Sequence, residues 1–216
     1  MRTIRDLSIR AGMRILVRVD FDVPVSSQGV IAEPFRIQRQ EATLRYLLEQ
    51  GATIVLVAHI SATPSFEPLM SQLRELLHLP ELGYLADIKD ISTSATSGVW
   101  LLDSIRRYEG EERNDGTFAA ELAKGFDAYV NNAFAVSHRN HASVSAIARV
   151  LPAYAGFLIE EEVSALRQAI DAPSDGKVEV MGGAKTETKV PVSKNLLPKA
   201  EYIILGGVLA NDVARV

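Results

Sequence analysis

The sequence of 216 residues contains no cysteine. Disulfide bonds, thiolate nucleophiles and cysteine-ligated metal centres are therefore excluded. An excess of basic charge is also lacking, because the formal net charge is −4 and the isoelectric point is near 5.6. This balance argues against non-specific electrostatic binding to nucleic acid or to an anionic membrane surface. Any anion site must then be a local basic cluster, and the four histidines remain available for its chemistry.

Long apolar runs are missing as well. No uninterrupted apolar stretch approaches the roughly 20 residues of a membrane span, and the segment Met1–Leu7 lacks the apolar core of a secretory signal. We therefore expect a cytoplasmic protein with no membrane partner and no nucleic-acid partner. Apolar residues make up 47% and charged residues 23%, which is typical of a folded globular chain. The length allows one large domain, or one domain with part of a second.

Short β-branched runs alternate with segments of helical periodicity along most of the chain. This alternation predicts an α/β fold, a three-layer, Rossmann-like arrangement around a parallel sheet. The segment 80–98 is not assigned, and its serine-rich part, 92–97, is typical of a solvated loop. The expected strands are 15–19, 53–57, 99–102 and 128–130, and the expected helices are 36–50, 117–125 and 143–150.

A second, smaller unit is expected at the C-terminal end. A helix over 159–170 precedes a turn over 171–176, and the remainder predicts one strand–helix–strand unit with strands at 177–181 and 202–205. We accordingly divide the chain into a lobe over 1–155, a connecting helix and linker over 156–176, and an incomplete lobe over 177–216. A unit this small cannot bury its own faces, so we expect another copy or another chain to cover it.

Polar side chains follow the first two expected strands. In parallel sheets ligands bind outside the carboxyl ends of the strands, where these loops gather. Asp20 and Asp22 follow the first strand, Arg36 begins the first helix, and His59 follows the second strand. Each has a structural alternative that the sequence leaves open: aspartates cap turns, arginines are commonly solvated, and a histidine can cap a strand end.

Two later loops carry further basic side chains. Arg106 and Arg107 follow the third strand beside a cluster of carboxylates, and a surface charge network is the alternative reading there. The loop 131–143 holds His138, Arg139 and a second histidine immediately before a helix. A metal site is conceivable in this loop, but no third ligand has suitable spacing and the arginine disfavours a cation. A small phosphorylated anion suits these loops better.

A glycine turn begins the expected helix of the C-terminal unit. Gly182 and Gly183 follow a strand, and backbone N–H groups at a helix start can cradle phosphate. Lys185 and Lys189 lie one helical turn apart, on one face. The segment does not have the spacing of the standard phosphate-binding loop, so by itself this motif is weak.

Five segments taken together resemble the phosphoglycerate kinase family, and the resemblance extends over nearly the whole chain. Each resembles a family motif: R-V-D-F-N-V-P, P-G-E-E-x-N-D, V-N-D-A-F, H-R-A-H-A-S and G-G-A-K-V-S-D-K. Several ordered matches are specific where each alone is not. The corresponding segments are Val17–Pro24, Glu109–Asp115, Tyr129–Phe134, His138–Ser143, and Gly182–Lys185 with Lys189.

The resemblance implies a two-lobed kinase in which one lobe binds 3-phosphoglycerate and the other binds Mg-ATP, with reversible phosphoryl transfer between them in glycolysis. It also implies roles for individual residues. Arg36 and Lys189 would be catalytic. The nucleotide would contact Gly182, Gly183, Lys185, Lys189, Gly206 and Gly207, and the substrate would contact Asp20, Asp22, Arg36, His59, Arg106, His138 and Arg139.

The sequence departs from the family pattern at several positions. The H-L-G-R-P motif is represented by His59–Pro64 (HISATP), so its phosphate-binding arginine is absent. Asp22 stands where the family has asparagine, Asn132 stands where it has aspartate, and Arg107 stands where it has phenylalanine. The later magnesium-binding aspartate and glycine loop lie beyond the segment Gly206–Asn211, so we expect no complete ATP site in these residues.

Three interpretations remain open. The chain is a phosphoglycerate kinase whose missing part comes from elsewhere, or a non-catalytic relative that binds a phosphorylated acid, or a decayed relative that contacts proteins only. We expect weak or absent turnover by this chain alone.

Overall fold

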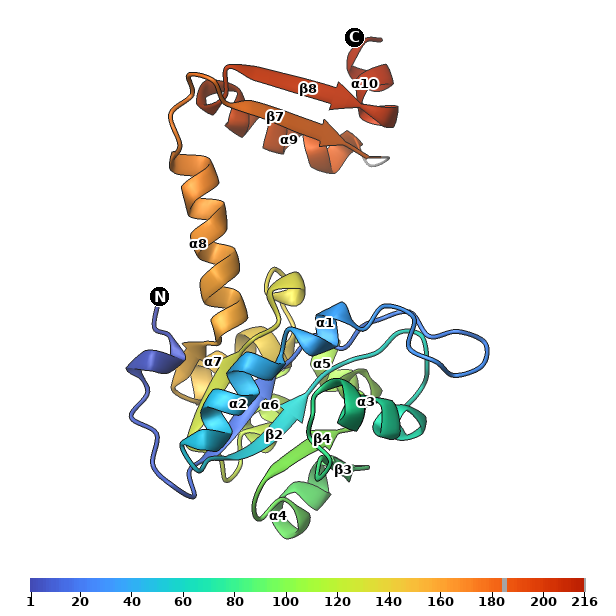
Figure 1. The fold of residues 1–216 in the computed structure, drawn as a ribbon, viewed down its shortest axis with the longest axis vertical. Helices are drawn as coiled ribbons and strands as arrows, with labels where there is room; N and C mark the ends of the chain where they lie inside the picture. Colours follow the sequence, from blue (N-terminus) through green and yellow to red (C-terminus); the bar gives the residue numbers. More distant parts are fainter. Residues whose placement is uncertain (184–185, 216) are drawn as a thin grey trace. The chain divides into compact units, whose positions relative to one another are not determined.

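The computed structural model describes residues 1–183 and 186–215, which form two compact units, 1–162 and 163–215 (Figure 1). The first unit contains a six-stranded sheet with strand order β3-β4-β2-β1-β5-β6, and every adjacent pair is parallel. The prediction of a parallel α/β sheet is confirmed. The strands are β1 (Arg14–Arg18), β2 (Thr53–Val57), β3 (Gly83–Leu85), β4 (Val99–Leu102), β5 (Ala128–Asn131) and β6 (Ala153–Ala155).

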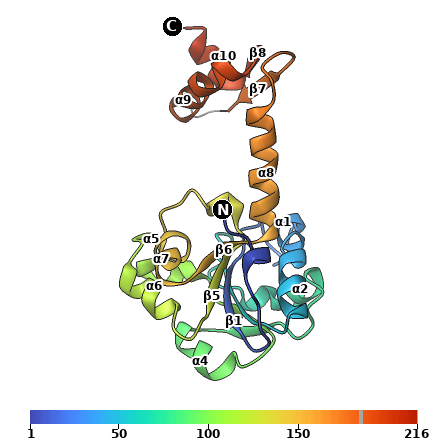
Figure 2. The same ribbon diagram turned by 90° about the vertical axis from the view of Figure 1, so that its left-hand side faces the viewer.

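Helices cover both faces of this sheet, with α1 and α2 on one side and α6 and α7 on the other (Figure 2). Within the described residues, none of the helices combines the length and apolar composition needed to cross a bilayer. The helices of the first unit are α1 (Phe35–Gln38), α2 (Glu41–Glu49), α3 (Met70–Leu76), α4 (Ile91–Ser94), α5 (Glu109–Glu112), α6 (Gly116–Leu122) and α7 (Ile147–Val150), followed by the start of α8 (Phe157–Asp171).

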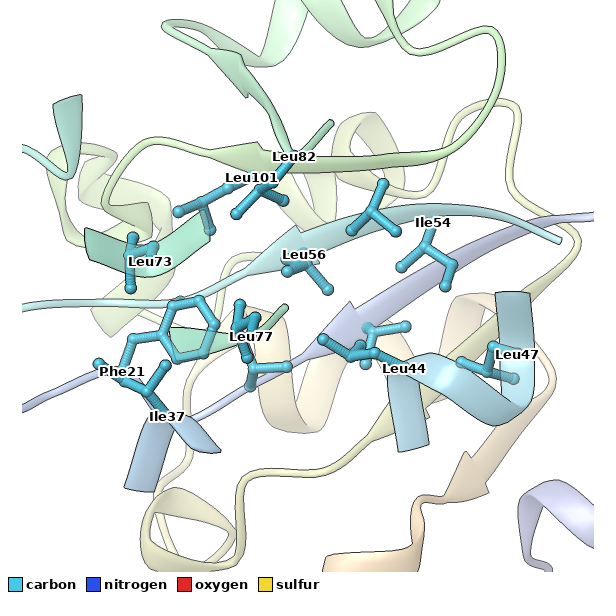
Figure 3. Close-up of a cluster of buried hydrophobic side chains, with 14 of the residues drawn as sticks. Phe21, Ile37, Leu44, Leu47, Ile54, Leu56, Leu73, Leu77, Leu82 and Leu101 are labelled. Atoms are coloured by element: carbon cyan, nitrogen blue, oxygen red, sulfur yellow. The ribbon is translucent and has the colours of Figure 1, made fainter. Parts of the chain in front are cut away.

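The two cores follow from the alternation of side chains along the central strands. Ile54 and Leu56 of β2 face one way and pack with Leu44 of α2 (Figure 3). Val55 and Val57 face the other way, into the second core. A strand buried on both faces reads as a continuous apolar run, which is why β2 is predictable from sequence.

The predicted helix over 36–50 is wrong near its start, where Arg39 and Gln40 separate α1 from α2. The side-chain amide of Gln40 donates to the Arg36 carbonyl at 3.1 Å, and the backbone N–H of Gln40 donates to the Ile37 carbonyl at 3.0 Å instead. The side chain thus takes the acceptor that a continuing α-helix would use, and the turn tightens locally.

Four further details correct the sequence prediction. The first strand spans Arg14–Arg18, one residue earlier than expected. The segment 92–97 is not simply a solvated loop, because α4 begins at Ile91, and Ile91 and Ala95 are buried one turn apart in the second core. The helix predicted over 143–150 is a π-helix over Ala142–Ala146 followed by α7, and the three-residue strands β3 and β6 were not predicted at all.

The second unit contains a two-stranded parallel sheet of β7 (Val178–Gly182) and β8 (Tyr202–Gly206), with α9 (Thr186–Leu196) and α10 (Gly207–Val213). Met181 and Leu205 pair across the strands on the face where the Ser193 hydroxyl of α9 lies 3.2 Å from the Met181 sulfur. The opposite face is apolar and solvent-exposed, since its four side chains are between 50% and 76% exposed. They are Val178, Val180, Tyr202 and Ile204.

Candidate functional site

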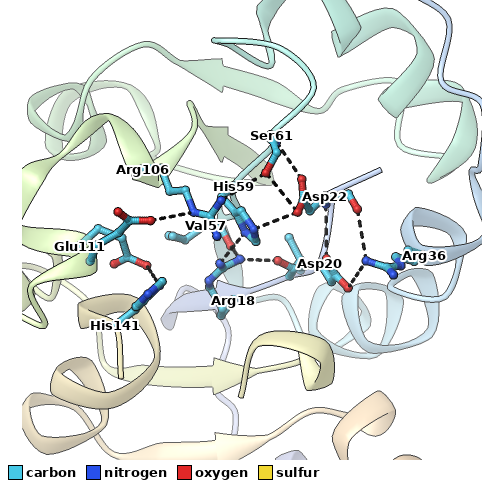
Figure 4. A network of polar contacts seen from close by, with 12 residues as sticks. Arg18, Asp20, Asp22, Arg36, Val57, His59, Ser61, Arg106, Glu111 and His141 are labelled. Carbon is cyan, nitrogen blue, oxygen red and sulfur yellow. Dashed lines mark hydrogen bonds and ion pairs between the residues drawn. The ribbon is translucent and has the colours of Figure 1, made fainter. Parts of the chain in front are cut away.

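Side chains from four loops meet at the carboxyl edge of the main sheet (Figure 4). Strands β2, β1 and β5 are neighbours in the sheet, so the segments that follow them begin side by side. The loop after β4 joins them through Arg106. We refer to the residues linked there by hydrogen bonds or ion pairs as the edge cluster, which comprises Arg18, Asp20, Asp22, Arg36, His59, Ser61 and Arg106.

Arg18 and His59 form the buried floor of the edge cluster, and each is only 1% exposed. The Arg18 guanidinium donates to the Val19 carbonyl at 2.6 Å and lies 3.0 Å from the His59 Nδ1. A guanidinium has no acceptor, so Nδ1 must accept this hydrogen bond, and the neutral imidazole then carries its proton on Nε2. Burial, with Arg18 and Arg106 nearby, lowers the pKa of His59 to about 4, which keeps it neutral at physiological pH.

The Asp22 carboxylate faces this imidazole. Its Oδ2 lies 3.2 Å from His59 Nε2, although the angle is unsuitable for a hydrogen bond, so the contact is one of charge and dipole. Its Oδ1 accepts a 2.7 Å hydrogen bond from the Ser61 backbone N–H. Burial opposes ionisation of Asp22, but the Ser61 N–H and the nearby basic groups outweigh it and lower the pKa of the carboxyl below its ordinary value.

Asp20 and Arg36 complete the cluster on the side of α1. The Arg36 guanidinium is half exposed, lies 3.6 Å from the Asp20 carboxylate, and donates to the Asp22 backbone carbonyl at 3.3 Å. Asp20 and Arg36, with Arg39 and Gln40, line a pocket of about 230 Å³ that also contacts Phe134. The structure therefore brings together five of the seven predicted substrate residues, namely Asp20, Asp22, Arg36, His59 and Arg106.

The remaining two predicted residues lie in the loop after β5. Arg139 is close enough to influence the pKa of His59, and its Nε is buried without a hydrogen-bond partner among the described residues. Such an unpaired donor is costly unless something outside the chain accepts it. His138 is exposed, and within the part of the chain that the structure describes it joins none of the cluster's hydrogen bonds or ion pairs.

The sequence reasoning missed a buried polar network behind the cluster. Glu111 is 0% exposed and accepts hydrogen bonds from the Ser143 backbone N–H at 2.8 Å and from the Ser143 hydroxyl at 2.6 Å. The Arg18 Nε in turn donates to that hydroxyl at 3.0 Å. An arginine inside a strand buried on both faces was the available signal, because such a charge requires buried partners.

Two of the unusual residues have clear structural partners. Asn132 is buried, and its amide donates to the Gln40 side chain at 2.7 Å while its carbonyl oxygen accepts from the Thr43 hydroxyl at 3.0 Å. Arg107 lies 2.5 Å from the buried Asp103 carboxylate and neutralises it. Both substitutions are therefore satisfied by contacts within the first unit.

The predicted nucleotide residues gather at one end of the small sheet in the second unit. Gly182 pairs with Gly206 across the strands, and Gly183 and Gly207 have φ values of 140° and 64°. The Lys189 side chain reaches the same turn, since its Cε lies 3.5 Å from where a Cβ on Gly183 would stand. Lys185 lies outside the described residues. Among residues 1–183 and 186–215, no group of three or more potential ligands is arranged to hold a metal ion.

The family model for phosphoglycerate kinase matches residues 4–216, almost the whole chain. The chain belongs to the phosphoglycerate kinase family. It is 40% identical to the phosphoglycerate kinase of Herpetosiphon aurantiacus over 97% of its own length and 56% of the relative, and 36% identical to that of Coprothermobacter proteolyticus with the same coverage. The chain thus spans a little over half the length of these phosphoglycerate kinases.

Solved structures of the family agree with this assignment. The crystal structure of phosphoglycerate kinase from Pyrococcus horikoshii matches 98% of this chain and 56% of its own, with a TM-score of 0.87 and 30% identity. The structure of phosphoglycerate kinase from Coxiella burnetii matches with a TM-score of 0.85, also at 30% identity. The fold of this phosphoglycerate kinase homologue is therefore that of its family over the residues shared.

Proposed function

We propose that this chain is the substrate-binding portion of a phosphoglycerate kinase, which transfers a phosphoryl group reversibly between ATP and 3-phosphoglycerate. In this proposal residues 1–155 bind the phosphorylated acid, residues 156–176 connect the lobes, and residues 177–216 supply part of the nucleotide lobe. Membership of the family supports this function.

The edge cluster is the observation that carries the proposal. Arg36 of α1 and Arg106 after β4 belong to the cluster, and Arg139 of the loop after β5 lies near it; each has hydrogen-bonding capacity near the same strand ends. Arginines suit phosphate and carboxylate groups because the planar guanidinium can donate two parallel hydrogen bonds. Asp20 and Asp22 supply acceptors for a substrate hydroxyl, and the neutral His59 supplies a donor.

Charge neutralisation would be the main chemical contribution of these residues. Phosphoryl transfer depends on positioning the reactants and on stabilising the charge that spreads over the equatorial oxygens. In this proposal Arg36 performs that task from the substrate side and Lys189 from the nucleotide side. The glycine turns at Gly182 and Gly206 leave room for phosphates, which Mg-ATP would supply when bound. In this proposal neither Arg36 nor Lys189 forms a covalent intermediate.

Titration calorimetry with 3-phosphoglycerate tests the binding proposal. We expect Arg36→Ala and Arg139→Ala each to weaken binding by about ten- to a hundredfold, since a charge-assisted hydrogen bond contributes about 1.5–3 kcal/mol. Arg45→Ala is the matched control, because Arg45 is a similarly exposed arginine of α2 that pairs with Glu41 outside the edge cluster. The absence of binding heat at millimolar ligand would contradict the proposal.

A non-catalytic homologue that binds a phosphorylated acid is the second candidate. The carboxylate at Asp22, which adds negative charge to the candidate anion site, favours it. A coupled kinase assay on the pure chain separates the two candidates. We expect little or no ATP-dependent turnover by this chain alone, so turnover at a rate typical of kinases, about 1–100 per second, would exclude the second candidate.

We also propose that a second copy of the chain covers the apolar face of β7 and β8. Val180 and Ile204 are cross-strand neighbours on this face, so the patch is contiguous and can pair with its own copy about a twofold axis. Sedimentation should show a concentration-dependent dimer that Val180→Lys abolishes. Val150→Lys, at an exposed valine of the first unit, should leave the dimer intact. A strict monomer at all concentrations would contradict self-association and leave a different chain as the partner.

A further inference from the structure

The Asp22 carboxylate occupies a position where several hydrogen-bond donors of the edge cluster converge. The Ser61 backbone N–H reaches its Oδ1 at 2.7 Å, the Ser61 hydroxyl lies 3.3 Å from its Oδ2, and His59 Nε2 lies 3.2 Å from the same oxygen. Two donors of Ser61 are directed at the carboxylate oxygens, and the Nε2 proton of His59 lies beside them without forming a hydrogen bond, which resembles the way proteins surround a bound anion. In this chain the anion is one of its own side chains.

The donor character of these groups is fixed by their neighbours. Arg18 occupies the Nδ1 of His59, so the proton of the neutral ring is on Nε2, which faces Asp22. Arg106 donates to the Ser61 oxygen at 3.2 Å, which leaves the hydroxyl proton of Ser61 free to point toward Asp22. Arg18 and Arg106 are both cations. The Ser61 hydroxyl accepts from Arg106 and donates to Asp22, so it bridges the guanidinium and the carboxylate.

The other basic group of the cluster is also held by acidic residues. Arg36 lies 3.6 Å from the Asp20 carboxylate and donates to the backbone carbonyl of Asp22. Arg36 is therefore neutralised within the cluster, whereas Arg106 also lies 3.4 Å from the Glu112 carboxylate outside it. The buried Nε of Arg139 is a donor that stays unpaired in the described residues.

We propose that Asp22 is a built-in competitor for the anion site, so that a phosphate or carboxylate group of a ligand must displace its carboxylate from Ser61 and His59 in order to bind. This inference rests on the proposed function, because it concerns the same site. An aspartate at this position, where the family has an asparagine, adds a negative charge that competes with the ligand. The side chain at this position thus sets the affinity of the site for anions as a class.

The competition is tested by titrating the full chain with 3-phosphoglycerate, and separately with inorganic phosphate, at constant ionic strength. Asp22→Asn keeps an oxygen that can accept from the Ser61 N–H but removes the charge. We expect it to tighten binding of both anions by about tenfold, because it removes a like charge next to the ligand. Asp22→Ser, which removes the carboxylate altogether, should tighten binding in the same direction. Glu81→Gln changes the net charge equally at an exposed position outside the cluster and should leave affinity unchanged.

The possible outcomes separate this inference from the proposed function. Binding by the parent chain that neither neutral variant tightens, with melting temperatures preserved, would overturn the role of Asp22 and leave the proposed function standing. An equal gain in Glu81→Gln would also overturn it, since the effect would then be one of net charge. If the parent chain and both Asp22 variants bind neither anion at millimolar concentration, the competitor role and the proposed function both fail.

Discussion

Replacing Glu111 by glutamine should destabilise the first unit strongly. Glu111 is fully buried, and both of its oxygens accept from Ser143, one from the backbone N–H and one from the hydroxyl. A glutamine amide would turn its NH2 group toward one of these two donors. The substitution would also remove the negative charge that balances the buried Arg18. Burial lowers the pKa of Arg18, and the charge of Glu111 acts in the opposite direction by raising it.

The size of the loss follows from the fate of Arg18. Arg18 and Glu111 are not in direct contact, since the Ser143 hydroxyl bridges them. Removing one partner of a direct buried ion pair costs about 3–5 kcal/mol, because the remaining charge stays buried and uncompensated. Arg18 would keep its hydrogen bonds to the carbonyls of Val19 and Val57, which reduces the penalty. We therefore expect the free energy of unfolding to fall by about 3 kcal/mol, near the lower end of that range.

Urea unfolding followed by tryptophan fluorescence measures the change in the free energy of unfolding of the first unit, residues 1–162. The chain has one tryptophan, Trp100, and it lies in β4 of the main sheet, so its signal reports on the first unit only. Glu109→Gln is the matched control, since Glu109 is 82% exposed on the same helix and pairs with Arg113. An exposed ion pair of this kind contributes about 0–1 kcal/mol.

Equal, small losses in Glu111→Gln and Glu109→Gln, below about 1 kcal/mol, would refute the reasoning. Such a result would mean that water or local rearrangement satisfies Arg18 as well as Glu111 does.

Two further predictions use the same fluorescence assay. The pKa of His59 is lowered from 6.5 to about 4, so between these pH values the unfolded chain binds more protons than the folded one, and stability must fall as pH is lowered through this window. We expect a loss of about 2–3 kcal/mol that His59→Asn removes, and an identical pH dependence in both proteins would contradict it. Gly156→Ala should lower stability by about 3 kcal/mol, because its Cβ would stand 2.2 Å from Asn132 Oδ1. Gly116→Ala, where a Cβ meets nothing within 4 Å, should cost little, and equal effects would show that the backbone relaxes freely.

The central strands were predictable because each is a short apolar run buried on both faces. β2 and β4 have the expected bounds, since Thr53–Val57 and Val99–Leu102 contain little that competes with a strand. β6 was missed because three residues provide no periodicity, and its position depends on pairing with β5 and with Thr3. The break between α1 and α2 depends on the Gln40 side chain, whose amide donates back to α1 while its oxygen accepts from Asn132, far along the chain.

The candidate site was predictable where polar residues directly follow strands. Asp20, Asp22 and His59 come to the carboxyl edge for that reason, and Arg36 joins them through α1. Glu111 and Ser143 were missed because a glutamate in the acidic run over 109–112 reads as solvated. Glu111 is buried because α5 packs against the π-helix after β5, where Ser143 links Glu111 to Arg18 of β1. These segments are far apart in the sequence, so no local pattern predicts the contact.

The helix α8 has a consequence for limited proteolysis. The division between the two compact units falls after Glu162, inside this continuous helix over Phe157–Asp171. Proteases cleave extended, exposed segments more readily than hydrogen-bonded helices, and the exposed turn over 172–176 is the nearest such segment. The first stable fragment should therefore end within this turn and carry the whole of α8, which mass spectrometry of the digest can verify. A shortened variant ending at Asp171, rather than at Glu162, is accordingly the natural form in which to study the first unit by itself.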